Sequence, residues 1–190
     1  MTLGEEESRE FYILYYGIFV WVNKKLKLFP DVIFDIDKQK LDLEKALAIR
    51  AEILKNPNLI NDYLSVNKDI LTEEEYSTIE LWRKYYYTHA YYIVRNQKKY
   101  SVFMRVEDGG VLSLYGVKAL GGPLSIDFFR GHELPISINA ILLPFKDIII
   151  CDSFLGLYDD DIDDTKRNRI NLDYYMVKER LGITESLPRD

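Results

Sequence analysis

Hydrophobic positions in the first half of the chain recur mainly at helical spacing. Residues 11–22 are apolar almost throughout, three glutamates precede them, and Lys24, Lys25 and Lys27 follow. Negative charge at the start and positive charge at the end complement a helix dipole, so we predict a helix over residues 5–27. Its aromatic and β-branched residues keep a strand as the alternative.

Two shorter helices are predicted next. Asp42 is a suitable N-cap for a helix whose apolar residues recur at helical spacing until Asn56. Pro57 then starts a short helix, because proline is well accommodated in the first helical turn. The apolar residues of this short helix share one face and are Leu59, Ile60, Tyr63 and Leu64.

A tyrosine-rich helix is predicted over residues 72–97. Thr72 and Glu75 form a capping box, in which each side chain satisfies a free amide of the other residue. At 100° per residue this helix carries two apolar strips. The second strip consists of Leu81, Tyr85 and Tyr92. Such a helix either packs between two layers or offers its second strip to a protein partner.

From residue 100 the hydrophobic period changes from helical to two, which is typical of strands. Two alternating segments, 100–106 and 111–117, flank Asp108-Gly109-Gly110 and predict a hairpin. Further strands are predicted over residues 124–129, 135–143 and 146–151.

The predicted elements indicate an α+β fold in a single domain spanning residues 1–190. We expect the mainly helical half (1–97) to pack on an antiparallel β-sheet or small barrel (100–158). A C-terminal helix (163–182), capped by Asp163 or Asp164, closes the fold. Its buried stripe is predicted to contain Ile170, Tyr174, Val177 and Leu181.

Composition narrows the class of protein. The fractions of hydrophobic and charged residues, 47% and 29%, are those of a globular chain. The apolar run at residues 11–22 is shorter than the roughly 20 residues that cross a bilayer, and the glutamates before it do not fit a signal peptide. A lone cysteine, Cys151, excludes an internal disulfide. We therefore expect a cytoplasmic protein without a membrane partner.

Several segments together resemble a group of small bacterial proteins. Residues 142–153 read LLPFKDIIICDS and resemble the motif LLPFKD-IIxDG of a group common in Firmicutes. Residues 11–25, 59–64 and 80–84 are similar as well. The resemblance implies a small cytoplasmic protein and no catalytic residue, because none is established for the group. Ser153 stands where the motif has Gly.

The acidic run at residues 159–164 is a candidate metal site. Carboxylates are the ligands that Ca²⁺ and Mg²⁺ prefer, which makes Asp159, Asp161 and Asp163 candidate ligands of a metal-dependent enzyme. A calcium loop starting at Asp159 would need Gly and Glu where the chain has Asp164 and Ile170. The more common interpretation is a solvated loop that caps the last helix.

The basic segment at residues 95–99 is a candidate nucleic-acid site. Arg95, Lys98 and Lys99 would meet phosphates, and neighbouring tyrosines would stack on bases. The alternative is that these cations simply end the predicted helix. A net charge of −6 argues against general nucleic-acid binding.

The remaining chemistry-bearing residues favour structural roles. His89 and His132 lack the spacing of a zinc-binding pair, and Cys151 ends an all-apolar strand, which is typical of an inert buried thiol. The sequence contains no phosphate loop, dinucleotide fingerprint or nucleophile elbow, so we predict no cofactor. Tyrosine-rich amphipathic surfaces then favour a non-enzymatic interaction or regulatory protein that binds another protein or itself.

Overall fold

The computed structural model describes residues 3–31, 34–35, 40–107, 110–120, 133–152, 154–157 and 161–188. The chain divides into two compact units. Residues 4–86 form a helical unit, and the chain from Tyr87 onward, together with Leu3, forms a β unit. The predicted α+β class is confirmed, whereas the single cooperative domain stays a prediction.

Four helices are described in the helical unit: α1 (Glu5–Leu26), α2 (Leu43–Lys55), α3 (Asn58–Asn67) and α4 (Glu73–Tyr85). Two short strands, β1 (Phe34–Asp35) and β2 (Lys40–Leu41), pair antiparallel between α1 and α2 in the sequence. No described helix, α1 included, combines the length and the hydropathy that a membrane-spanning helix needs.

The predicted caps form as the local sequence requires. An Asp42 carboxylate oxygen accepts from the Lys45 amide at 3.3 Å and begins α2. Thr72 and Glu75 make the capping box of α4, with the Thr72 amide donating to Glu75 Oε2 at 2.8 Å. Pro57 occupies the N-cap, so α3 begins one residue later than predicted.

Aromatic side chains form the core of the helical unit. The ring of Phe11 on α1 lies 5.1 Å from the Trp82 ring of α4, and Tyr15 meets the same indole edge-on at 5.8 Å. The Tyr15 and Tyr86 hydroxyls are 3.0 Å apart and buried. The apolar run at residues 11–22 therefore packs α1 against α4.

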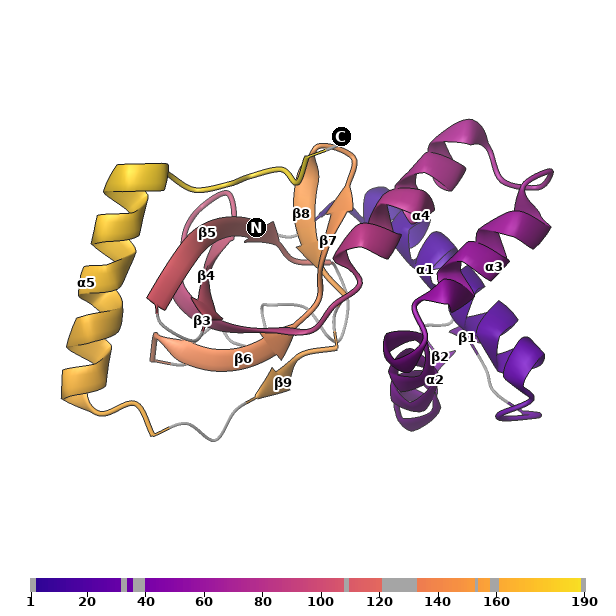
Figure 1. The fold of residues 1–190 in the computed structure, drawn as a ribbon, viewed down its shortest axis with the longest axis horizontal. Coiled ribbons are helices and arrows are strands. Elements are labelled where there is room, and N and C mark those ends of the chain that lie inside the picture. Colours follow the sequence, from indigo (N-terminus) through magenta and orange to yellow (C-terminus); the bar gives the residue numbers. More distant parts are fainter. Residues whose placement is uncertain are drawn as a thin grey trace. The chain divides into compact units, whose positions relative to one another are not determined.

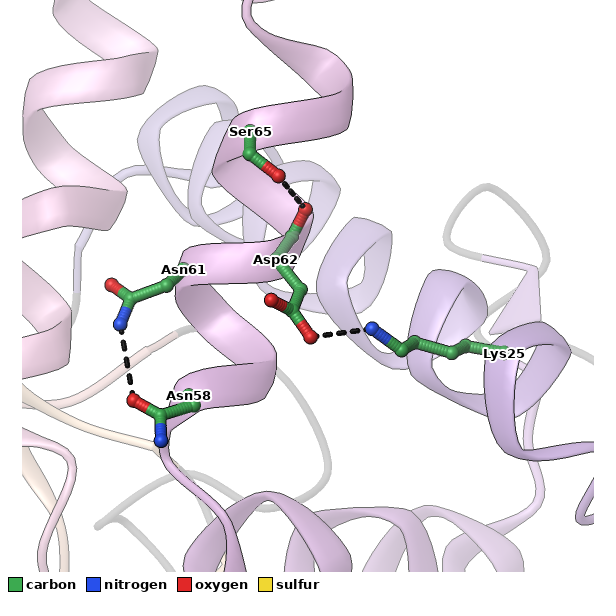
Figure 2. A network of polar contacts seen from close by, with 5 residues as sticks. All are labelled: Lys25, Asn58, Asn61, Asp62 and Ser65. Carbon is green, nitrogen blue, oxygen red and sulfur yellow. Dashed lines mark hydrogen bonds and ion pairs between the residues drawn. The ribbon is translucent and has the colours of Figure 1, made fainter.

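Polar side chains tie α3 to its neighbours. Lys25 at the end of α1 pairs with Asp62 of α3 (Figure 2). The Lys25 Nζ also lies 4.7 Å above the Trp21 ring. Asn61 accepts from Arg83 Nη1 of α4 at 2.9 Å. Three of the segments quoted for the bacterial resemblance thus meet in one network, which positions α3 between α1 and α4.

The β unit contains a curled sheet of seven described strands in the order β7-β8-β5-β4-β3-β6-β9 (Figure 1). Their bounds are β3 (His89–Asn96), β4 (Ser101–Glu107), β5 (Gly110–Lys118), β6 (Ile136–Ala140), β7 (Leu142–Phe145), β8 (Ile148–Cys151) and β9 (Gly156–Leu157). All neighbours are antiparallel except β5 and β8, which pair parallel. The expected antiparallel sheet is therefore mixed, because a hairpin pattern reveals only pairs that are close in sequence.

Covalent continuity explains why this sheet curls. Strand β6 pairs with β3 and strand β7 pairs with β8, so they belong to opposite parts of the sheet order. Only Ile141 separates them in the sequence. The two parts must therefore approach each other, and the Asp152 amide donates to the Ile141 carbonyl at 3.2 Å at this corner. The curled sheet is therefore a half-barrel, intermediate between the β-sheet and the small barrel that were the two predicted alternatives.

Helix α5 (Asp164–Leu181) covers the outer face of the sheet (Figure 1). Ile170, Tyr174 and Val177 pack there on a cluster of buried strand residues. The strand residues of this cluster are Val94, Val102, Met104 and Leu114. The predicted helix is confirmed, but Leu181 is exposed rather than part of the buried stripe.

The helix predicted over residues 72–97 is wrong in its second half. Helix α4 ends at Tyr85, and His89–Asn96 form β3 between β4 and β6. Tyrosine, isoleucine and valine are strong strand formers, and a short aromatic run fits both periods. Hydrogen-bonded pairing with β4 and β6 on its two sides makes this segment a strand.

The strand predicted over residues 124–129 lies outside the described residues.

Candidate functional site

Three large apolar side chains form a patch on the outward side of α5. Leu172, Tyr175 and Met176 are 60%, 58% and 53% exposed. They follow at i, i+3 and i+4 spacing, which brings side chains side by side on a helix surface. We call these three residues the α5 patch. Its apolar surface is contiguous, unlike the single exposed apolar residues that most surfaces carry.

Helix α5 is anchored at both ends. At its start Asp163 Oδ1 accepts from the Lys166 amide at 2.7 Å, and Arg167 donates to the Leu134 carbonyl. After the helix, Thr184 lies beside β5, exchanging backbone hydrogen bonds of 2.9 Å with Leu114 and Gly116. The α5 patch therefore sits on a fixed support, which lowers the entropy cost of binding.

Arg95 takes part in holding α5. Its guanidinium lies 4.8 Å from the Tyr174 ring centre and 5.7 Å from that of Tyr175. Cations over aromatic faces are attracted by the ring quadrupole. One of the predicted nucleic-acid residues is thus stacked on tyrosine rings of the helix that carries the α5 patch.

Two opposite charges flank the α5 patch along the helix. Arg169 precedes it and Glu179 follows it, and both are exposed. Neither has an ion-pair partner in the part of the chain that the structure describes. Arg180 is exposed next to Glu179. The patch therefore has an apolar centre and a charged rim, the usual anatomy of a protein interface.

The other two basic candidates lie in a turn. Lys98 and Lys99 are exposed between β3 and β4, where the Gln97 amide donates to the Tyr100 carbonyl at 2.8 Å. They do not end a helix, as the alternative supposed, because residues 89–96 are a strand. Nucleic-acid binding by Arg95, Lys98 and Lys99 stays a prediction, with Arg95 already engaged by tyrosine rings.

The acidic candidates are placed only in part. Asp163 is the N-cap of α5, as the structural interpretation of the run expected. Asp161 is exposed, and Asp159 lies outside the described residues. Among the residues with described positions, no three His, Cys, Asp or Glu side chains are grouped to hold a metal ion. The metal site stays a prediction.

The predicted partner strip does not form one helical surface. Leu81 and Tyr85 lie on α4 in the helical unit, whereas Tyr92 lies on β3 in the β unit. All three are half-buried. The strip depended on a single helix over residues 72–97, and the strand at 89–96 removes that geometry.

Polar side chains also gather on the inner face of the curled sheet. Arg105 Nη2 lies 3.4 Å from His89 Nδ1. A guanidinium has no acceptor, so Arg105 donates in this contact and the imidazole nitrogen accepts. Tyr91 is edge-on to both His89 and Tyr115, and burial together with Tyr115 holds the pKa of Tyr91 well above its usual value. His89 thus belongs to a sheet cluster, not to a helix.

Cys151 is buried in β8, as predicted. Its Sγ lies 3.8 Å from Asp152 Oδ1, a contact in which the thiol donates and the carboxylate accepts. Asp152 is fully buried and also accepts from the Phe154 amide at 3.3 Å. Cys151 is therefore a buried thiol packed against its neighbours in the sheet.

His132, the other predicted histidine, lies outside the described residues.

Comparison with known proteins yields no relative: no protein-family model, no curated protein and no solved structure matches the chain. The resemblance to the bacterial group consequently stays an expectation.

Sequence reasoning missed the α5 patch, although the signal was present. Leu172, Tyr175 and Met176 recur at helical spacing opposite the predicted buried stripe. The sequence places these residues on one face of the helix but does not show whether another part of the chain covers that face. The structure decides this, because Ile170, Tyr174 and Val177 pack on the sheet and the opposite face stays exposed.

Proposed function

We propose that this protein is a non-enzymatic interaction or regulatory protein of the bacterial cytoplasm that binds another protein chain through the α5 patch. The observation that carries the proposal is the exposure of three adjacent large apolar side chains on a helix whose opposite face is buried. Exposed apolar surface is unfavourable in water, and a partner that covers it recovers this free energy.

The chemistry of the surface favours a protein over a small molecule as its ligand. Small-molecule sites are concave, whereas the outward side of a helix is convex. Tyr, Met and Arg are enriched in protein interfaces, and the α5 patch offers Tyr175 and Met176 with Arg169 at its rim. An amphipathic helical strip is also a recurring mode of recognition between proteins.

The cytoplasmic part of the proposal rests on two observations. The single cysteine is buried and unavailable for disulfide pairing. The segments at residues 11–25 and 142–153 resemble those of small cytoplasmic bacterial proteins. A reducing compartment suits a chain that has no disulfide to stabilise it.

Site-specific photo-crosslinking in living bacterial cells tests the proposal. A photoreactive phenylalanine analogue replaces Leu172 in one variant and Ile70 in a control variant, since Ile70 is 79% exposed but lies in the helical unit. We expect a discrete protein adduct from position 172 that mass spectrometry identifies, and none from position 70.

Adding Met176→Asp to the Leu172 variant should abolish the adduct, because a charge in the α5 patch opposes burial. Circular dichroism should stay unchanged, as Met176 is exposed. If position 172 gives no more adduct than position 70, the α5 patch is not a protein-binding surface and the proposed function is wrong.

A further inference from the structure

We infer that the protein chain that covers the α5 patch is a second copy of this protein, with the two α5 helices packed antiparallel. The inference rests on the proposed function and names the partner for the same surface. It follows from the spacing of four residues on the outward side of α5, which are Arg169, Leu172, Met176 and Glu179.

These four residues form a seam suited to helix pairing. Their spacings of three, four and three residues are those of the a and d positions of a coiled coil. At 100° per residue they occupy an arc of about 80°. Helix α5 has 18 residues and a length of about 27 Å, which is enough to present the whole seam to a partner helix. Tyr175 flanks the seam.

The seam is self-complementary when the helices run antiparallel. Arg169 lies five residues before Tyr174, and Glu179 lies five residues after it. A two-fold axis level with residue 174 therefore places Leu172 opposite Met176 of the second copy and Arg169 opposite Glu179. The Leu172–Met176 contact and the Arg169–Glu179 ion pair each form twice, as an interface between identical surfaces requires.

A parallel pair would not be complementary. It would place Arg169 opposite Arg169 and Glu179 opposite Glu179, and like charges facing across an interface are unfavourable. In the single chain these two charges have no ion-pair partner among the described residues, so each is available to the second copy. The charge pattern thus selects both the partner and the orientation.

The affinity of such a dimer should be moderate. One pair of helices makes a small interface, and small interfaces give weak, concentration-dependent association. We expect a Kd on the order of 10 μM at physiological salt. Added salt should weaken the dimer, because the exposed ion pairs are screened.

Sedimentation equilibrium of the full chain at increasing concentration tests the inference. We expect a monomer–dimer equilibrium that Leu172→Asp abolishes and Ile70→Asp leaves unchanged. Leu172 and Ile70 are both exposed, so circular dichroism should show intact folding in both variants. A wild-type chain that stays monomeric over the whole range overturns the inference.

Charge reversal tests the orientation. Arg169→Glu and Glu179→Arg should each weaken the dimer by roughly tenfold. Glu179→Arg should be the more damaging change, because Arg180 already adds positive charge at that end. The double variant Arg169→Glu/Glu179→Arg restores opposite charges across the antiparallel pair and should recover wild-type affinity to within roughly threefold.

The outcomes separate the two proposals. A monomer whose position 172 crosslinks to a different protein supports the proposed function and overturns the homodimer. A dimer that tolerates Leu172→Asp, or a double variant weaker than both single variants, overturns the α5 pairing. A monomer with no crosslink at position 172 overturns both.

Discussion

The ring of Tyr100 leaves no room for a side chain at Gly116. Gly116 lies on β5 opposite Val102 of β4, and a Cβ atom at this position would come within 3.0–3.1 Å of the Tyr100 ring. Tyr100 is buried, so the ring has little room to move. Gly116 is therefore required by packing against a flat aromatic face, not by an unusual backbone angle.

Replacement of Gly116 by alanine should destabilise the protein. The added methyl group must displace the Tyr100 ring or the backbone of β5, and such overpacking costs about 1–3 kcal/mol. Chemical denaturation followed by circular dichroism measures the change. Gly156→Ala is the matched control, because its Cβ would meet Asn139 at an ordinary 3.5 Å. A Gly116→Ala variant as stable as this control would show that the contact relaxes freely.

Arg95 shows why single residues of the candidate sites were hard to assign. In the sequence it stands with Lys98 and Lys99 in a basic segment, and that pattern suggests phosphate binding. Its actual neighbours, Tyr174 and Tyr175, are distant in the sequence and reach it only when α5 packs on the sheet. Residue type and local spacing carry no information on such a contact.

Among whole elements, α5 depends most clearly on its cap. Asp163 lies at its N-terminus, where the first amides of a helix have no partner within the helix. The same aspartate belongs to the acidic run that suggested a metal site. Capping and metal binding predict different effects of mutation, which makes α5 a good element for a test.

Asp163→Ala should lower the free energy of unfolding by about 1 kcal/mol, because the Lys166 amide loses its acceptor. Asp163→Asn should keep most of the stability, since an amide oxygen also caps. Thermal unfolding with and without Ca²⁺ or Mg²⁺ measures both effects. We expect no dependence on either ion and no effect of Asp161→Ala. A melting temperature that rises with a divalent ion, and does so less after Asp161→Ala, would instead favour the metal prediction.

Residues 72–97 were predicted as one helix, but only the start of that helix was predicted correctly. The capping box at Thr72 and Glu75 correctly located the start of α4, because its contacts span only three residues. The end was missed because residues 86–97 contain no glycine or proline to stop a helix. Alternating burial of Tyr91 and Val94 on opposite faces arises only after β3 pairs with β4 and β6.

At the scale of the whole molecule, the described residues of each unit form a core of their own. One is the aromatic core of the helical unit, and the other consists of the two faces of the curled sheet. Both tryptophans, Trp21 and Trp82, lie in the helical unit. Tryptophan fluorescence therefore reports on one core alone, which allows the expectation of a single cooperative domain to be tested.

If the chain is one cooperative domain, both cores should unfold together. We expect the fluorescence midpoint in urea to coincide with the midpoint of hydrogen exchange in peptides from β4 and β5. Trp82→Phe, which perturbs only the helical core directly, should then shift both midpoints equally. Two separate midpoints, or a shift confined to fluorescence, would establish two independent domains.

The sequence by itself determined the local features: the α+β class, the caps at Asp42, Thr72 and Asp163, and the hairpin that joins β4 to β5. These features depend on residues a few positions apart, so their physical causes are visible in the chain. Only the tertiary structure decided that residues 89–96 form a strand, that β5 and β8 pair parallel, and that the α5 patch is exposed on the single chain. These outcomes depend on which distant surfaces bury each other, and burial is a property of the folded chain.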